Sequence, residues 1–204
     1  MKALLYKDWQ IGHKLLFLSL AVSLLVLFIV GDGQFPLSLG LMLALFNIRN
    51  IDGLDDKRPY QQLIQSLPVT RKEVVAGKIL SHFIQVAILI IPIIGLNALI
   101  PGYTANSLSE VLLLGLLAVF LLVGYQFTYT LFGPVFMNYV SIALFLVLIT
   151  FGWSIFNSAF VQGLIRQLLT MDQTLLILSA SLFCLILASA LFILTVKIYE
   201  RKDL

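Results

Sequence analysis

The sequence has little charge and almost no cysteine. Only 11% of its 204 residues are charged, against roughly a quarter in average soluble chains, while 60% are hydrophobic. Such a chain has too little polar surface to coat a soluble globule, so we expect the lipid bilayer to be its solvent. The single cysteine, Cys184, lies in an apolar run, which leaves no disulfide framework and no Cys/His spacing typical of a zinc site.

The chain also lacks the motifs of enzymes that act in or at membranes. It contains no Gly-x-x-x-x-Gly-Lys-Ser/Thr sequence, and its loops are too short for an ATPase domain, so we expect no nucleotide site in this chain. His13 and His82 have no Ser or Glu partner at the spacing of an intramembrane protease, and we interpret both as structural. Ionisable residues are nearly absent from the apolar runs, which argues against proton-coupled transport. We expect neither enzymatic activity nor a cofactor in this chain.

The apolar residues gather into six segments that predict membrane-spanning helices. The first run has no convincing small-x-small cleavage site, so we interpret it as a retained helix rather than a signal peptide. Gly133-Pro134 is the only strong break between Val111 and Ile165, an uncharged stretch that must therefore cross twice. The prediction is a single all-α, polytopic membrane domain with an N-terminal interfacial helix over 1–14 and spans at 15–30, 35–48, 79–100, 108–132, 139–156 and 174–196.

The basic residues predict an orientation for these spans. Twelve of the thirteen Lys and Arg residues fall on the side of the two termini, and Arg166 alone falls on the other. The positive-inside rule then places both termini and the loop 49–78 in the cytoplasm, and the segment 158–173 outside. The helical pattern of that outer segment predicts an amphipathic surface helix or a re-entrant pair.

Two capping boxes predict helix starts. Thr70-Arg71-Lys72-Glu73 precedes the third span, and Ser107-Leu108-Ser109-Glu110 begins the fourth. Arg71, Lys72 and Lys78 surround the first of these starts, and we interpret them as interfacial anchors.

The loop 49–78 contains a short amphipathic segment between Pro59 and Pro68. Its apolar residues recur at i, i+3, i+4 and i+7, which predicts a helix of about two turns with a glutamine-rich back. A helix this short is marginal in water and needs a surface, for which the pattern leaves the membrane, the chain's own bundle or a protein partner open. The segment comprises the apolar residues Tyr60, Leu63, Ile64 and Leu67, with Gln61 among the polar ones.

The stretch from Ser66 to Val75, followed by Lys78, resembles the "SLPVSRKEIV…K" stretch of bacterial type-2 ABC exporter permeases, and the opening from Met1 to Trp9 is similar too. The subgroup it resembles most contains the membrane subunits of phenol-soluble modulin exporters. The resemblance implies a six-span half-transporter in the bacterial plasma membrane that pairs with a second permease subunit, either another copy or a related chain. It also implies cytoplasmic ATPase subunits that hold ATP and magnesium and dock on a coupling helix, a role that falls here on Tyr60, Gln61, Leu63, Ile64 and Leu67.

Four polar or aromatic side chains lie at similar depth in the third and fourth predicted spans. We treat them as candidates for lining a translocation path, because an amphipathic or lipid-like substrate that enters from the cytoplasm would meet a weakly polar, aromatic wall. The alternative is that they form hydrogen bonds between neighbouring helices. These residues are Gln85, Tyr125, Gln126 and Tyr129.

Two functions follow from these patterns. The first is the membrane permease of an ATP-driven exporter, with an ATPase subunit, a second permease and membrane lipid as partners, no nucleic acid, and amphipathic peptides as the substrate suggested by analogy. The alternative is a non-transporting immunity or accessory protein that binds a toxic peptide. An accessory protein has no need of a docking helix for an ATPase, so the loop 49–78 distinguishes the two functions.

Overall fold

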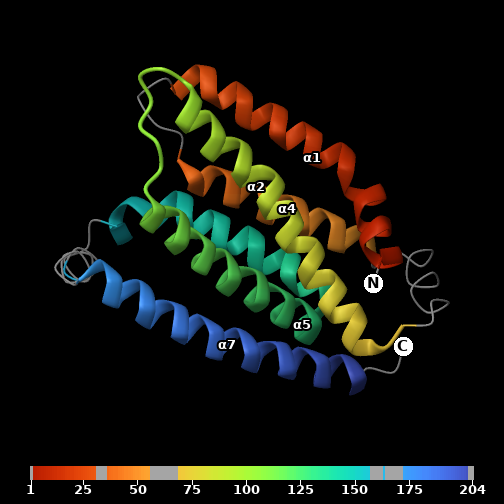
Figure 1. Cartoon of the computed structure of the whole chain (residues 1–204). Coiled ribbons are helices and arrows are strands. Elements are labelled where there is room, and N and C mark those ends of the chain that lie inside the picture. The colour runs from red at the N-terminus through yellow and green to blue at the C-terminus, as the bar shows by residue number, and fades with distance from the viewer. Residues whose placement is uncertain (1, 31–35, 56–68, 157–162, 164–171, 202–204) are drawn as a thin grey trace.

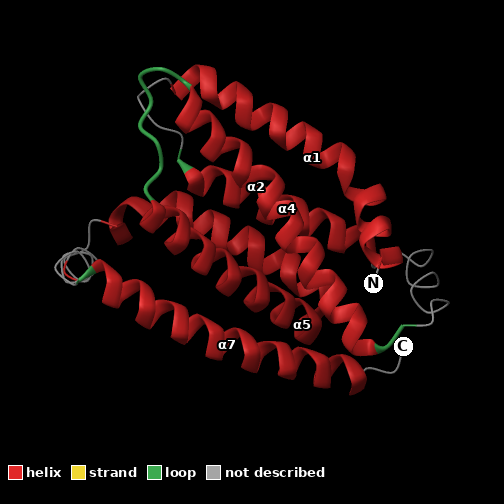
Figure 2. Ribbon diagram, in the orientation of Figure 1, coloured by secondary structure: helices red, strands yellow, loops and turns green. Residues whose placement is uncertain are grey.

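Helices account for all the regular structure in the part of the chain that the computed structural model describes, which is residues 2–30, 36–55, 69–156, 163 and 172–201. An apolar chain satisfies its backbone hydrogen bonds within each helix and so needs no water to do so. The helices, shown in Figures 1 and 2, are α1 (Lys2–Val30), α2 (Leu37–Asp55), α4 (Arg71–Leu99), α5 (Leu108–Phe156) and α7 (Gln173–Arg201).

The helices form a bundle in which the two termini lie at the same end (Figure 1). At this end, which we call the terminal end, α1 and α4 begin and α2 and α7 finish; the other end is the opposite end. α1 packs against α2 and α4 on one side of the bundle, and α7 packs against α5 and α4 on the other. Residues far apart in sequence, in α2, α4 and α5, therefore meet at the terminal end.

α5 consists of two helical halves that meet at Gly133. This glycine has φ 82° and ψ 176°, a conformation that residues with a side chain rarely adopt. Pro134, the next residue, has no N–H to donate to the helical hydrogen bonds. Figure 1 shows the green half running to the terminal end and the cyan half returning to the opposite end. The break falls at the Gly133-Pro134 pair, and helical structure resumes at Pro134 rather than at residue 139.

Four helical segments in the described residues are long and apolar enough to cross a membrane. Their composition matches the requirement for about 20 mainly apolar residues in a hydrocarbon layer about 30 Å thick. The chain is thus an all-helical, multi-pass membrane protein. The segments are Leu37–Leu54, Arg71–Leu99, Leu108–Ala143 and Thr174–Arg201.

Helices α1 and α2 both extend beyond the spans expected for them. α1 is continuous from Lys2, so no break separates an interfacial helix over 1–14 from a span at 15–30. α2 continues past residue 48 to Asp55, because its buried stripe extends through Ile48 and Ile51, and Ile51 packs against Gly12 of α1. The first turns after the expected span are thereby part of the bundle and not of a loop.

Both predicted capping boxes are confirmed. The Thr70 N–H donates to Glu73 Oε2 at 2.8 Å, and the Glu73 N–H donates to Thr70 Oγ1 at 3.3 Å, so α4 begins at Arg71, ahead of the apolar span expected at 79–100. At the start of α5 the Ser107 N–H donates to Glu110 Oε2 and the Glu110 N–H donates to Ser107 Oγ, both at 3.2 Å. Each box satisfies backbone donors that the first helical turn leaves without a partner.

The core lies where α1, α2, α4 and the first half of α5 meet. Leu41, Ile48, Leu89 and Leu122 are among its buried members. Gly40 lets α2 approach α4 closely, since a Cβ there would lie 2.7 Å from Ile93 Cδ1. Small residues at such crossings are the usual basis of helix packing in membranes, where the hydrophobic effect does not drive helices together.

Candidate functional site

A carboxylate is buried where α2 reaches the terminal end. Asp52 is 1% exposed, and its Oδ1 lies 3.6 Å from Lys78 Nζ of α4. Its Oδ2 lies 3.4 Å from Nε2 of His82, one turn further along α4 and also buried. The ammonium of Lys78 compensates a charge that would be costly to leave unpaired in this interior.

Two tyrosines of α5 complete this site. The Tyr129 hydroxyl donates to the backbone carbonyl of Asp52 at 2.9 Å, and its ring lies 5.6 Å from the Lys78 ammonium. The Tyr125 ring meets His82 edge-on at 6.1 Å and Tyr129 at 5.8 Å. We call these five residues, Asp52, Lys78, His82, Tyr125 and Tyr129, the Asp52 cluster.

The Asp52 cluster connects three helices beside the segment that joins two of them. Asp52 lies in the last turn of α2, and Lys78 and His82 lie in the early turns of α4, the two helices that residues 56–68 connect in the sequence. Tyr129 ties the same point to α5. The cluster therefore links α2, α4 and α5 through buried polar contacts.

A second polar contact lies at the same end of the bundle. Arg49 of α2 donates to Asn138 Oδ1 from Nη2 at 2.9 Å and from Nε at 3.2 Å. Asn138 belongs to the second half of α5, beyond Gly133, whereas Tyr129 belongs to the first half. The end of α2 therefore holds both halves of α5.

The four candidate path residues lie inside the packed bundle. Gln85 and Gln126 are buried, and each amide makes a long hydrogen bond on its own helix, to Ser81 Oγ at 3.5 Å and to Thr130 Oγ1 at 3.4 Å. Tyr129 is buried and Tyr125 half-buried, and both belong to the Asp52 cluster. The structure thus joins the two tyrosines in one site and leaves the two glutamines outside it.

The predicted coupling helix lies outside the described residues, as does all but a few positions of the segment 158–173. The residues concerned are Tyr60, Gln61, Leu63, Ile64 and Leu67. The helices that flank them, α2 and α4, are described up to Asp55 and from Arg71.

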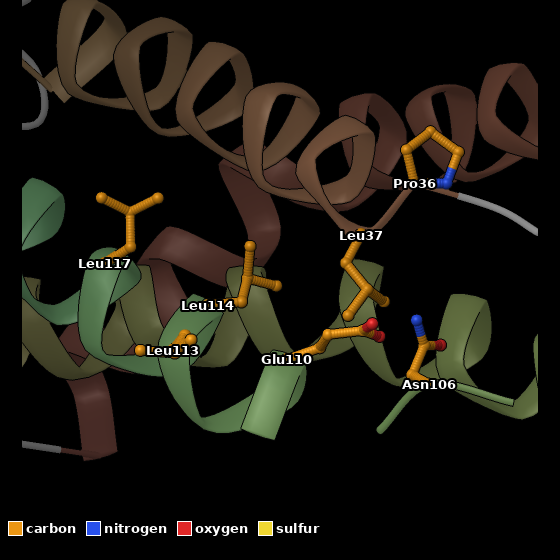
Figure 3. A pocket seen from close by; sticks show the side chains of 7 residues that line it. All are labelled: Pro36, Leu37, Asn106, Glu110, Leu113, Leu114 and Leu117. Carbon is orange, nitrogen blue, oxygen red and sulfur yellow. The ribbon is translucent and has the colours of Figure 1, made fainter. Parts of the chain in front are cut away.

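A different kind of site lies at the opposite end. An open hollow of about 480 Å³ lies between the start of α2 and the first turns of α5, and Figure 3 shows the side chains that line it. Glu110 is the only charged residue among the lining side chains described, and its carboxylate also closes the capping box of α5. The hollow is otherwise mainly apolar, with Pro36, Leu37, Asn106, Leu113, Leu114 and Leu117 around it.

Sequence reasoning missed three members of the Asp52 cluster. It placed Asp52 in a loop, Lys78 at the membrane interface as an anchor, and His82 among structural residues. Two signals could have revealed the cluster: the apolar stripe of α2 continues through Ile51, and Lys78 and His82 are spaced i, i+4 on one helix face. In the described part of the chain, no group of three His, Cys, Asp or Glu residues could hold a metal ion.

Comparison with known proteins gives one match. A family model described as "ABC-2 family transporter protein" matches residues 3–200. No curated protein and no solved structure matches the chain. The matched range contains the whole Asp52 cluster, the hollow beside Glu110 and the segment 56–68.

Proposed function

The chain belongs to the ABC-2 family of transporter proteins, and we propose that within this family it is the six-span permease of an ATP-driven exporter. The match over nearly the whole chain carries this proposal. Permeases of ABC transporters associate with an ATPase subunit, and this chain has no nucleotide-binding motif of its own. ATP and magnesium are then held by the partner, and the contribution of this chain is to form the path and to move.

Six crossings follow if every helical pass traverses the membrane. α1, α2, α4, the two halves of α5 and α7 run alternately between the terminal end and the opposite end (Figure 1). The distribution of twelve basic residues against one supports a cytoplasmic terminal end in a bacterial plasma membrane. A second permease subunit, either another copy or a related chain, would complete the path.

The amphipathic segment between Pro59 and Pro68 is the proposed docking site for the ATPase. Its apolar residues Tyr60, Leu63, Ile64 and Leu67 would enter the partner, with Gln61 at the edge of the contact. What supports this role is its position in the chain, because the segment lies between the end of α2, which carries Asp52, and the start of α4, and both of these lie at the terminal end.

Movement of the docked segment would separate or rotate the ends of α2 and α4 against α5. The contacts that resist this movement are Asp52 to Lys78 and Tyr129 to Asp52. In the state described here Gln85, Gln126 and Tyr129 are buried. They would line a path together with Tyr125 only when these helices move apart, and an amphipathic substrate would then meet both polar and aromatic groups.

Co-purification tests the docking proposal. The tagged chain, expressed with the ABC ATPase subunit encoded beside it, should retain that subunit, and Leu67→Asp should remove it, because a buried leucine is worth about 1.5–3 kcal/mol and a buried unpaired charge is costly. Gln65→Asp adds the same charge on the polar back of the segment and should leave the complex intact. A complex that survives Leu67→Asp with its transport activity would contradict docking at this segment, whereas a natural chain that retains no ATPase subunit would favour an accessory protein.

A further inference from the structure

A groove between α1 and α4 has a polar floor, of which the proposed transport path uses Gln85 alone. Its volume is about 290 Å³, near the lower end of the range for ligand pockets. Asp8 of α1 and Ser81 and Gln85 of α4 line it and are buried. Tyr6 and Trp9, which also line the groove, are 64% and 45% exposed. Buried polar side chains thus lie beneath exposed aromatic rings.

The polar floor of the groove has more hydrogen-bond acceptors than donors that a ligand could use. Gln85 is 4% exposed, and its Oε1 has no hydrogen-bond partner in the part of the chain that the structure describes. Its amide nitrogen makes only a long contact with Ser81 Oγ, at 3.5 Å. The Asp8 carboxylate is paired with Lys7 Nζ at 3.1 Å, so the charge beside the groove is largely compensated. A buried carbonyl oxygen without a partner costs roughly 1–3 kcal/mol, which a ligand that donates a hydrogen bond would recover.

The side chains along the walls of the groove indicate the charge of the ligand's head and the nature of its tail. Aromatic faces such as those of Tyr6 and Trp9 attract a cation by cation–π interaction. Leu16 and Ile84 line the groove alongside the polar floor, and they suit a hydrocarbon chain. We propose that the groove between α1 and α4 binds an amphiphile whose head is a primary ammonium, with its head on Gln85 and its chain along α1.

The position of the groove matches such a ligand. Tyr6 and Trp9 lie in the early turns of α1 at the terminal end, and these residue types concentrate at membrane–water interfaces. On the proposed function, that end is the cytoplasmic face, so the head of an amphiphile in the inner leaflet would reach the groove without leaving the membrane. The ligand is then either a transported amphiphile or a lipid with an amine head, which share this chemistry.

Fluorescence quenching tests the proposal on the full chain without an ATPase. Trp153→Phe leaves Trp9 as the one tryptophan, since the chain has two. The probes are three alkyl chains with a nitroxide near the head, identical except that the head is an ammonium, a hydroxyl or a carboxylate. In a non-ionic detergent, the ammonium probe should have the highest affinity of the three, measured by the concentration at which it quenches Trp9 fluorescence. Gln85→Leu should weaken its binding about tenfold, the value of one hydrogen bond to a charged group.

Asn47→Leu is the matched control, because it removes a buried amide that lies outside the groove and donates to Ser19 Oγ at 2.6 Å. It should leave ammonium binding unchanged. Equal binding of the three probes, or binding that Gln85→Leu leaves unchanged, would overturn the proposal. Absence of ammonium binding would not contradict the permease assignment, which co-purification with the ATPase tests separately.

Added lipid identifies the source of the ligand. If vesicles that contain phosphatidylethanolamine displace the ammonium probe and vesicles of phosphatidylcholine alone do not, the ligand is a membrane lipid. If neither displaces it, the groove prefers single-chain amphiphiles and the ligand is a transported one. Both results support recognition of a primary ammonium, whereas equal displacement by both vesicles would contradict it.

Discussion

At the scale of single residues, the most informative feature is a carboxylate in an apolar bundle. Asp52 lies between Lys78 and His82 of α4 and holds Tyr129 of α5 through its backbone. Replacing a whole buried ion pair by apolar groups is often nearly neutral, whereas removing one partner is strongly destabilising. The Asp52 cluster therefore fixes how α2, α4 and α5 lie against one another more than it adds net stability.

Asp52→Ala should destabilise the protein by about 3–5 kcal/mol, because it leaves the Lys78 ammonium buried without its counter-charge. Thermal unfolding of the purified protein in detergent measures this loss. Adding Lys78→Met should recover a large part of it, since the uncompensated charge is then gone. If the double variant is as unstable as the sum of the two single variants, Asp52 and Lys78 are not coupled and the cluster is not a connection between α2 and α4.

At the scale of helices, local chemistry explains where most elements begin. Thr70 and Glu73 satisfy each other's backbone donors at the start of α4, and the same box recurs at Ser107 and Glu110. α7 begins after Asp172, whose Oδ1 accepts from the Thr174 N–H at 2.9 Å and from the Thr174 hydroxyl at 2.7 Å. Each start is defined by one or two side chains, which makes it testable by single substitutions.

Thr70→Ala should cost about 1 kcal/mol, because it removes the acceptor for the Glu73 N–H. The loss should appear as faster hydrogen exchange in the first turn of α4. Thr70→Ser retains the hydroxyl and serves as the control, with exchange close to that of the natural protein. Equal effects of alanine and serine would show that the methyl group of Thr70, and not its oxygen, matters.

The start of α7 should weaken in acid. Hydrogen bonds from the Thr174 hydroxyl and N–H hold the pKa of Asp172 below its ordinary value of 3.8. Because the folded pKa is lowered, the stabilisation is complete above the unfolded pKa and disappears as pH falls through the folded value. Hydrogen exchange at Thr174 and Leu176, whose N–H groups bond to Asp172, should therefore accelerate below about pH 3.8. Asp172→Asn keeps an N-cap but does not titrate, and it should remove this acceleration; an unchanged pH dependence would contradict the assignment.

Gly133→Ala tests the break in α5. The φ and ψ of Gly133 fall in a region that only glycine populates readily, so a Cβ there should cost about 1–3 kcal/mol. Gly124→Ala is the control in the same element, because a Cβ at that position meets nothing within 4 Å and alanine favours helix. It should be neutral or stabilising in thermal unfolding. If both alanines have the same effect, the two halves of α5 do not depend on the conformation of Gly133.

At the scale of the whole molecule, the sequence was enough to predict a membrane-embedded, all-helical chain, two capping boxes and a break at Gly133-Pro134. Composition, cap chemistry and the properties of glycine and proline act locally, so they can be read without the fold. The burial of Asp52 could not be predicted in this way, because it depends on how far α2 stays packed against α1 and α4. Likewise, the groove beneath Trp9 exists only because α1 and α4 lie side by side.

The central claim is that the chain is a permease coupled to a cytoplasmic ATPase through residues 56–68. The most direct measurement is cross-linking of Leu63→Cys, in a Cys184→Ser background that removes the natural cysteine, to the ATPase subunit in native membranes. Gln65→Cys, on the polar back of the segment, is the matched control. We predict a cross-link to the ATPase from position 63, a weaker one from position 65, and no labelling of either by an impermeant thiol reagent added to intact cells. Labelling of Leu63→Cys from outside, with no cross-link to the ATPase, would contradict both the orientation and the coupling.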